Sequence, residues 1–349
     1  MWKTVIAVAA GSVLLAGCGS GSISSPSGAT SANSASNVPS TQPSNPTGSL
    51  ASAYKTTVWE DNFANDPAGP LSTSSSDWAE ETGNGVAYGN AGWGNNEAEY
   101  YLPGNATVGG GTLNLHGHAD SSVLNDTCGT STPGNCMFSS AKVTSLKTVD
   151  LSQSGFLEIK AELPTGTGSW PALWLLPGPN PDLSSPPNVN NGQPTWPAGG
   201  EIDMVEWLGR YFAGQDSLVQ STLHLPSGTP SPTYTDSFEY QKATLSSPLS
   251  TSFHLYQLAW TPGQIEFAVD NQVIMTCTKS TMSCTPTVAG IPSFPASSIW
   301  PYGTTAKNYY VIMNLAIGGY LGAPNGDNTQ VPANYDQTMQ VAYVRYMTP

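Results

Sequence analysis

The feature that most constrains this chain is a two-residue alternation of apolar and polar side chains, which recurs in short runs along most of its length. In a strand, successive side chains point to opposite faces, so each run places its apolar residues on one face of a sheet. Turns rich in Gly, Pro and Asn separate the runs. We therefore predict two antiparallel sheets packed as an all-β sandwich, with one concave face that suits an extended polymer. The clearest runs are Thr112 to His118, Gly155 to Leu163, Ser221 to Leu225, Leu255 to Trp260, Gln264 to Val269, Tyr309 to Ile317 and Met339 to Met347.

A short N-terminal segment has the pattern of a processing signal. Lys3 supplies a positive start, Val5 to Leu15 is apolar, and the sequence LAGC ends at Cys18. The apolar run is too short to remain as a membrane-spanning helix, and LAGC resembles the bacterial lipobox, whose Cys becomes the acylated first residue. We predict a signal peptide at residues 1–17 and a lipid on Cys18. Cleavage before an unmodified Cys is the alternative.

Residues 18–52 consist almost entirely of Ser, Gly, Pro, Thr, Asn and Ala. Such a segment buries too little apolar area to offset the entropy of ordering it. We predict a disordered tether that joins Cys18 to a single folded domain at residues 53–349. The domain would lie outside the cytoplasm, held to a bacterial cell envelope and its membrane by the lipid, or secreted.

Five cysteines are present, and assigning Cys18 to the lipid leaves two local pairs. In an oxidising compartment, two short-range disulfides are expected, and we predict that Cys128 pairs with Cys136 and Cys277 with Cys284. Four cysteines allow three connectivities. A zinc site built from all four thiolates is the alternative, although their spacings do not match paired zinc knuckles.

The formal net charge of −14 arises from few charged residues, which make up 10% of the chain. Binding to phosphates needs a basic surface, so nucleic acid is not an expected partner. A neutral or weakly charged polymer suits this composition better.

The stretch GEIDMVEWLG, residues 200–209, places Glu201, Asp203 and Glu206 inside an apolar, strand-like run. Buried acids are costly unless they line a cleft. In a regular strand, Glu201 and Asp203 share a face and Glu206 points the other way, but one inserted residue, a β-bulge, returns Glu206 to their side. Two carboxyls roughly 5 to 5.5 Å apart suit retaining glycoside hydrolysis. Ligands for a metal such as Ca²⁺, or solvated acids of an edge strand, are the alternatives.

The chain resembles glycoside hydrolase family 16, specifically its laminarinase-like endo-β-1,3-glucanases. The resemblance implies a concanavalin-like β-jelly-roll, with Glu201 as nucleophile, Asp203 as supporting acid and Glu206 as general acid/base. The ExDxxE spacing is that of the bulged branch, which includes laminarinases and agarases, so it leaves the sugar open. The blocks that carry the match are WGNNEAEYY from Trp93, AKVTS from Ala141, LPTGTGSWPALWLLP from Leu163, GEIDMVEWLG from Gly200, FHLYQLAWTPGQIEFAVDNQ from Phe253 and NYYVIMNLAIGGY from Asn308.

Aromatic rings stack on the apolar faces of sugars, so tryptophans near the acids are candidates for a glucan cleft. Packing is the alternative for the tryptophans, a turn is the alternative for Asn96, and a structural role is the alternative for His224. Trp207 follows Glu206 directly and would point opposite to it unless a further bulge intervenes. The predicted substrate-binding residues are Trp174, Trp170, His224, Asn96, Trp207 and Lys142.

Three positions depart from the family pattern. Lys142 stands where Arg is common, and Lys cannot form the same forked hydrogen bonds to sugar hydroxyls. Glu99 stands where many members have Gln. Ala342 replaces an Asp that helps to bind structural calcium, which argues against that site, and no cofactor is expected to be required. The Pro-rich insertion from Pro177 to Pro197 would form one wall of the cleft or a surface loop.

We therefore predict a monomeric, endo-acting retaining glycoside hydrolase whose partner is β-1,3-glucan of the laminarin type or mixed β-1,3-1,4-glucan. An agarose-type galactan hydrolase or a transglycosylase of the same fold is one alternative. A carbohydrate-binding jelly roll without catalysis is the other, although a pure binder has no need of a proton donor.

Overall fold

The computed structural model describes residues 50–129, 134–178, 196–229, 234–286 and 293–349. The predicted signal peptide, Cys18 and almost all of the tether lie outside the described residues, as does most of the Pro-rich insertion. All the described residues belong to one compact unit. None of the helices in the described ranges is long and apolar enough to cross a membrane.

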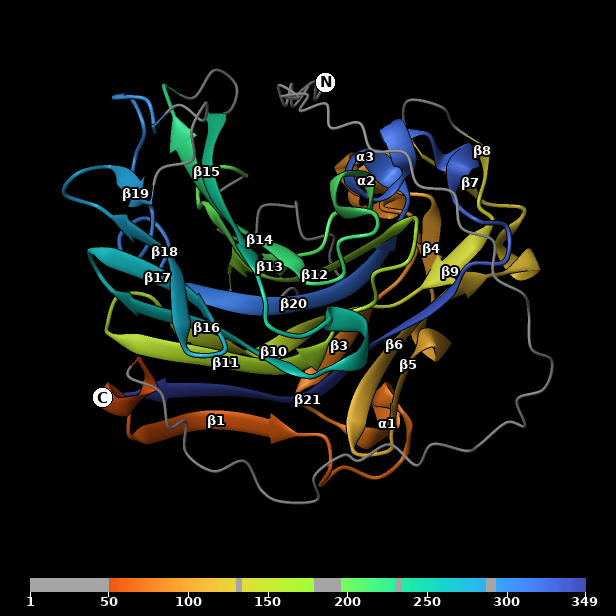
Figure 1. Ribbon diagram of the computed structural model, residues 1–349, viewed down its shortest axis with the longest axis horizontal. Helices are drawn as coiled ribbons and strands as arrows, with labels where there is room; N and C mark the ends of the chain where they lie inside the picture. The colour runs from red at the N-terminus through yellow and green to blue at the C-terminus, as the bar shows by residue number, and fades with distance from the viewer. Residues whose placement is uncertain (1–49, 130–133, 179–195, 230–233, 287–292) are drawn as a thin grey trace, which may run out of the picture. The chain divides into compact units, whose positions relative to one another are not determined.

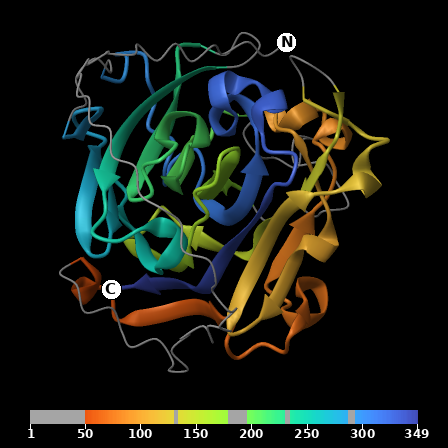
Figure 2. The same cartoon turned by 45° about the vertical axis from the view of Figure 1, so that its right-hand side comes forward.

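The larger sheet has twelve strands. β1 (Thr56–Asn62) pairs with β21, and β9 (Phe138–Ser140) joins β6 to β4 (Glu99–Tyr101); the β4–β9 pair is parallel. The main path runs β19 (Ser283–Thr285), β18 (Gln272–Thr278), β17 (Gln264–Val269), β16 (His254–Thr261), β11 (Gly155–Glu162), β21 (Asp336–Thr348), β6 (Thr112–Ala119), β5 (Ala106–Gly109) and β2 (Gly69–Pro70). Figure 2 shows β21, in dark blue, beside the yellow β6.

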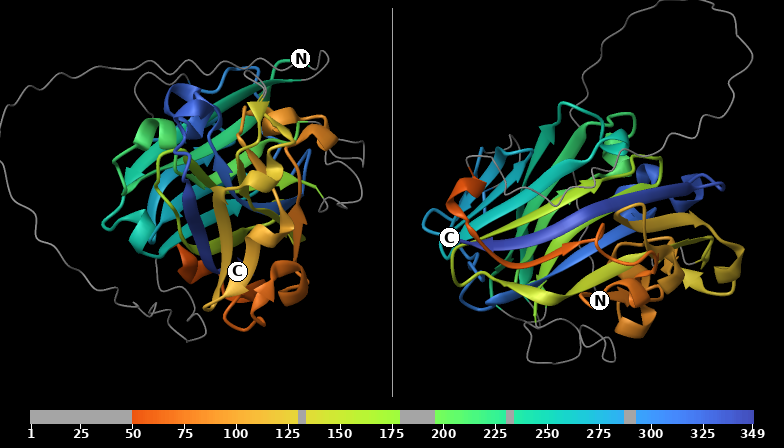
Figure 3. Two further views of the ribbon diagram at one scale, coloured as in Figure 1. Left: turned by 90° about the vertical axis from the view of Figure 1, so that its right-hand side faces the viewer. Right: turned by 90° about the horizontal axis from the view of Figure 1, so that it is seen from below.

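The second sheet has seven strands and is antiparallel throughout. Its order is β15 (Thr235–Thr244), β14 (Leu218–Ser227), β13 (Glu201–Glu206), β12 (Ser169–Pro177), β20 (Asn308–Ile317), β10 (Lys142–Asp150) and β3 (Trp78–Glu81). A separate pair consists of β7 (Thr127–Cys128) and β8 (Gly134–Asn135). Figures 1 and 3 show the two large sheets as stacked layers.

The described helices are all short. The α-helices are α1 (Leu71–Ser74), α2 (Gly209–Phe212) and α3 (Gly319–Gly322). The 3₁₀ turns are Ala51–Ala53, Val86–Tyr88, Ala91–Gly94, Pro103–Asn105, Ser121–Val123, Leu249–Thr251, Pro324–Gly326 and Asn328–Gln330.

Alternation along the strands decides which side of the seven-stranded sheet faces the core. Leu173 and Leu175 of β12 are fully buried and belong to the same apolar cluster as Leu157 and Ile159 of β11 in the other sheet. Trp174, between the two leucines, therefore points to the opposite side. The prediction of an all-β sandwich of two sheets is confirmed, and the outer face of the seven-stranded sheet is left for polar and aromatic side chains.

Both predicted disulfides are present. Cys128 is bonded to Cys136, and Cys277 is bonded to Cys284 across the β18–β19 pair. All four side chains are buried. The zinc alternative is therefore excluded, because these sulfurs are bonded to each other.

Candidate active site

β13 carries the three acids and contains the predicted bulge. Asp203 pairs with Thr222 of β14, yet the next paired residue is Glu206 with Gln220, so the register shifts between the two acids. The same shift appears against β12. Gln220 and Thr222 are two residues apart on β14 and share a face, whereas their partners Glu206 and Asp203 are three residues apart on β13. The extra residue in β13 therefore returns Glu206 to the face of Asp203. The prediction that one bulge aligns the acids is confirmed.

Glu206 and Glu201 have different hydrogen-bond partners on this outer face. Trp170 Nε1 donates to Glu206 Oε1 at 2.9 Å, and Thr222 Oγ1 donates to Glu206 Oε2 at 3.3 Å. Trp196 Nε1 donates to Glu201 Oε2 at 2.8 Å. Glu206 is buried, whereas Glu201 is partly exposed. The two carboxyls are thus held by indole donors from different segments of the chain.

The environment favours the protonated forms of both glutamates. Burial, followed by the charge of Asp203, raises the pKa of Glu206 to about 7, against the hydrogen bond from Trp170. Burial and the same charge raise the pKa of Glu201 well above its usual value. The two carboxyls titrate as a coupled unit, so these shifts do not by themselves assign which one carries the proton. They do place a carboxylic acid at the site near neutral pH, as general acid catalysis requires.

His224 lies between two carboxylates. Its Nε2 is 3.1 Å from Asp203 Oδ2 and its Nδ1 is 3.0 Å from Asp236 Oδ2. Burial disfavours the imidazolium, but the charges and hydrogen bonds of Asp236 and Asp203 outweigh burial and raise the pKa of His224 well above its usual value. Sequence analysis placed His224 near the acids, and the structure does so.

Glu201, Asp203 and His224 are the one group of possible metal ligands among the described residues, with ligand atoms within 4.8 Å of one another. Both ring nitrogens of His224 lie against carboxylate oxygens. A protonated imidazole has no free lone pair for a cation. The arrangement therefore fits an ion pair better than a metal site.

Trp170 and Trp174 extend from β12 on the face of the acids. Trp170 is only 7% exposed and its indole N–H is bound by Glu206, so it holds the acid and leaves little ring area for a sugar. Trp174 is partly exposed, and its Nε1 donates to Asn314 Oδ1 at 2.7 Å. Trp174 is thus the better placed of the two to stack against a sugar ring.

Lys142, at the start of β10, is enclosed next to these tryptophans. Its Nζ lies 3.0 Å from Glu81 Oε2, 4.1 Å from the ring centre of Trp93 and 5.4 Å from that of Trp174. Cation–π contacts of this kind are attractive and orient the rings. Lys142 therefore helps to hold the rings of Trp93 and Trp174 in place. Its direct contact with a sugar stays a prediction.

Asn96 and the acids next to it form a buried corner. Asn96 has φ of 61° and is 3% exposed, and its carbonyl accepts from Asn328 Nδ2, which supports the turn interpretation. Burial raises the pKa of Glu97, against the hydrogen bond with Glu99, whereas burial and the charge of Glu97 together raise the pKa of Glu99 well above its usual value. Tyr101 links this corner to the acid face, since its hydroxyl contacts Glu97 and accepts from Asn314.

The prediction that Trp207 lines the groove is wrong. Its side chain is 0% exposed, lies in the main apolar core and packs edge-on against Phe212. Its Nε1 donates to the carbonyl of Gln215. The reason is local: the bulge turns Glu206 outward, so the residue that follows it enters the core.

Trp207 and Trp174 should respond differently to truncation. Trp207→Ala is expected to lower the free energy of unfolding by about 3–5 kcal/mol, because it removes a fully buried ring from a close-packed core. Trp174→Ala is expected to leave stability nearly unchanged and to raise KM for a glucan. Denaturant unfolding and initial-rate kinetics of the two variants separate these effects, and a Trp174 variant with wild-type KM would contradict the groove assignment.

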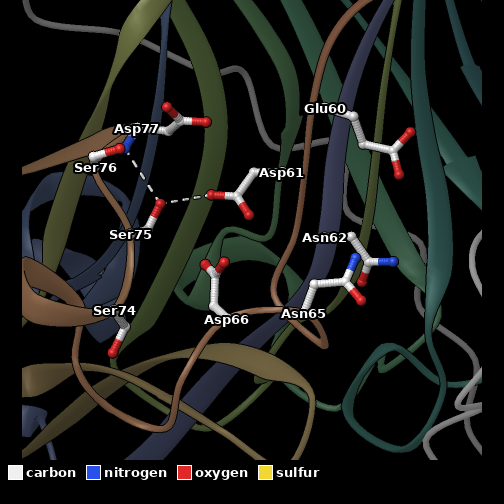
Figure 4. A pocket seen from close by; sticks show the side chains of 9 residues that line it. All are labelled: Glu60, Asp61, Asn62, Asn65, Asp66, Ser74, Ser75, Ser76 and Asp77. Atoms are coloured by element: carbon white, nitrogen blue, oxygen red, sulfur yellow. Dashed lines mark hydrogen bonds between the residues drawn. The ribbon is translucent and has the colours of Figure 1, made fainter.

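A pocket of about 280 Å³ lies at the end of β1, away from the three acids (Figure 4). Ser75 Oγ donates to Asp61 Oδ2 and accepts from the backbone N–H of Asp77. Burial and the charge of Asp61 raise the pKa of Asp66 to about 6. Serines, acids and amides line this pocket, with no aromatic platform, so we assign it no part in the reaction.

Trp196, Asp236 and Tyr302 belong to the site but were not predicted from the sequence. The Tyr302 hydroxyl contacts the carbonyls of Glu201 and His224, at 2.9 and 2.6 Å, and so ties β13 and β14 together from a distant loop. Trp196 precedes the acid strand closely enough to have been suspected. Asp236 and Tyr302 carry no local signal.

Comparisons with known proteins agree with this geometry. The model of the family described as Glycosyl hydrolases family 16 matches residues 119–314. The chain is 28% identical over 305 residues to glucan endo-1,3-beta-glucosidase A1 of Niallia circulans, covering 82% of this chain and 37% of the relative. It is 27% identical over 266 residues to a beta-glucanase of Rhodothermus marinus, covering 74% of this chain and 76% of the relative.

Among solved structures, the laminarinase catalytic domain from Thermotoga maritima matches with a TM-score of 0.60 and 27% identity. That match covers 85% of this chain and 98% of the other. The family model spans more than half of the chain, whereas the chain spans little more than a third of the first curated relative.

Proposed function

Since this chain belongs to glycoside hydrolase family 16 and is a glycoside hydrolase, we propose that it cleaves internal bonds of laminarin-type β-1,3-glucan or mixed β-1,3-1,4-glucan with retention of configuration. The relatives named above, a glucan endo-1,3-beta-glucosidase, a beta-glucanase and a laminarinase domain, support this substrate class. The observation that carries the proposal is the bulge in β13, which brings three acids to one face of the sheet.

In the proposed reaction, the Glu201 carboxylate bonds to the anomeric carbon while Glu206 donates its proton to the departing glycosidic oxygen. The ionised Glu206 then takes a proton from water, which displaces Glu201 and releases the sugar. Burial and the charge of Asp203 raise the pKa of Glu206, which helps Glu206 to hold its proton up to about pH 7.

The same face supplies a place for the polymer. We propose that a glucan chain crosses the outer face of the seven-stranded sheet and stacks on Trp174. The Lys142 ammonium and the Asn314 amide hold that ring in place. Stacking of the apolar face of a sugar on such a ring suits a neutral polysaccharide.

A panel of polysaccharides tests the proposal. Laminarin, curdlan, lichenan and agarose are each incubated with the protein, and the products are sized and their anomeric configuration followed by NMR. We expect short oligosaccharides from laminarin or lichenan, with the β-anomer formed first. Products from agarose alone would favour the galactan alternative, and longer products than the substrate would favour transglycosylation.

A binding module without catalysis is less well supported. Such a module needs aromatic rings but no protonated carboxyl, whereas this site holds a buried acid with two hydrogen-bond donors directed at it. Tight glucan binding with no product from any polysaccharide of the panel would favour the binding module.

We also propose that the enzyme works outside the cytoplasm, carried on a lipid at Cys18 by a flexible tether. The LAGC motif and the low-complexity composition support this, and metabolic labelling with a clickable fatty acid in a bacterial host tests it. Cys18→Ser should abolish the label. The monomeric state, the absence of a required cofactor and the lack of a calcium site stay predictions.

A further inference from the structure

Asp236, on β15, lies on the same face as the acids in an arrangement that the reaction as described does not use. In the β14–β15 register, Phe238 pairs with His224 and Asp236 pairs with Pro226. Residues two apart on a strand share a face, so Asp236 and His224 are on the same side of the sheet. A continuous line of contacts results, from Asp236 through both nitrogens of the imidazole to Asp203.

This line is buried. The side chains of Asp236 and Asp203 are each 6% exposed, and that of His224 is 16% exposed. Oδ1 of Asp236 is buried without a hydrogen-bond partner among the described residues. A buried carboxylate with an unsatisfied oxygen is costly unless a neighbouring cation compensates it, and the His224 imidazolium is in contact with it.

The titratable groups that face His224 come from two strands and one loop. β13 contributes Glu201, Asp203 and Glu206, and β15 contributes Asp236. Tyr302, from the loop before β20, contacts the His224 carbonyl with its hydroxyl. The rings of Phe238 and Trp196 flank the imidazole with centroids 5.5 and 6.4 Å away. Of these four carboxyls, Asp203 and Asp236 are in direct contact with the imidazole.

We propose that Asp236 is a positioning residue for the reaction: it keeps the His224 imidazole protonated, with its Nε2–H directed at Asp203. A protonated imidazole donates from both nitrogens, which both carboxylates require, whereas a neutral imidazole can donate to only one of them. With His224 fixed as a cation, Asp203 keeps its hydrogen-bond donor, and the charge of Asp203 acts on Glu206 to raise its pKa and retain the catalytic proton.

The inference rests on the proposed function for its effect on catalysis, but it makes a claim about His224 that needs no substrate. Without Asp236, burial would act against the imidazolium with Asp203 as the one remaining carboxyl in contact with it among the described residues. His224 would then lose its proton at a lower pH than in the wild type. Above that pH, the imidazole would be neutral and Asp203 would lose its cationic partner. In the tautomer with the proton on Nδ1, Asp203 would also lose its hydrogen-bond donor.

Titration of the histidine Cε1–H signals by NMR tests this directly. The chain has only four histidines, and the spectrum of His224→Gln identifies the signal of His224 by its absence. In Asp236→Asn we expect the midpoint of the His224 titration to fall by at least about one pH unit, equivalent to a tenfold change in its proton affinity. An unchanged midpoint would overturn the inference and leave the proposed function intact.

Kinetics then separate positioning from a general structural role. In Asp236→Asn, kcat on the preferred glucan should fall by about tenfold or more above the new midpoint and recover on acidification. Asp236→Glu, which retains the charge, should restore much of the wild-type profile. Ser237→Ala is the matched control, because it removes two hydrogen bonds of β15 without contact to His224. A loss that is equal at all pH values would contradict the positioning role.

Discussion

Glu201→Gln is expected to lower kcat on laminarin by about 10⁴- to 10⁶-fold, the range found when a hydrolase loses one member of its catalytic group. The amide matches the carboxylate in size and can still meet the indole N–H of Trp196, but it cannot bond to the anomeric carbon. Reducing ends released per enzyme measure the loss. Affinity for laminarin oligosaccharides, measured by calorimetry, should stay close to the wild-type value.

The matched control is Glu266→Gln, a partly exposed carboxyl on β17 of the other sheet. It should retain wild-type kcat, which rules out a general effect of replacing one acid. Near wild-type turnover in Glu201→Gln would place the nucleophile elsewhere, and loss of both turnover and affinity would indicate a disturbed face.

Glu206→Gln is expected to lower kcat on laminarin by about 10²- to 10⁴-fold, the usual contribution of a general acid. In the wild type, activity should fall as the pH rises through about 7, because the proton on Glu206 is lost there. The variant has no such proton, so this alkaline limb should disappear. A pH profile of kcat/KM measures both effects, and an unchanged alkaline limb in the variant would assign that ionisation to another group.

Leaving-group chemistry distinguishes the two glutamates more sharply. An activated aryl β-glucoside needs little protonation, so Glu206→Gln should release one equivalent of phenol rapidly and then stall at the covalent intermediate. With azide present, Glu206→Ala should give a β-glycosyl azide, whereas Glu201→Ala should give the α-anomer. Opposite products would exchange the two roles.

The bulge was predictable because it solves a problem that the sequence alone poses. An acid at position 206 of a regular strand would enter the core, where Val205 is now fully buried, and burying a carboxylate there is costly. The two-residue alternation therefore sufficed to infer one extra residue. It also predicted the sandwich, since the same alternation recurs in strands of both sheets.

The error at Trp207 shows the limit of judging a residue by its neighbours. An aromatic residue next to a catalytic acid is a natural candidate for sugar binding, but the alternation that moves Glu206 outward moves Trp207 inward. The same rule, applied one residue further, assigns Trp207 to the core, where it has no exposed surface.

Side-chain contacts that depend on the pairing of strands far apart in the chain could not be predicted from the sequence. Glu81 reaches Lys142 because β3 pairs with β10, and Asp236 reaches His224 only through the exact register of β14 with β15. A shift of one residue in either pair would turn these acids to the other face. The periodicity within one strand does not show how that strand is aligned with its neighbour.

The position of β20 in the seven-stranded sheet bears on how the enzyme is made. β20 lies between β12 and β10, and Asn314 on it contacts Trp174, which is 140 positions away in the chain. Contacts between such distant segments form slowly, because the chain must close a long loop before they stabilise it. During synthesis, the first 300 residues would leave the ribosome with the middle of this sheet open, so a nascent chain must avoid aggregation and proteolysis until its last strands emerge.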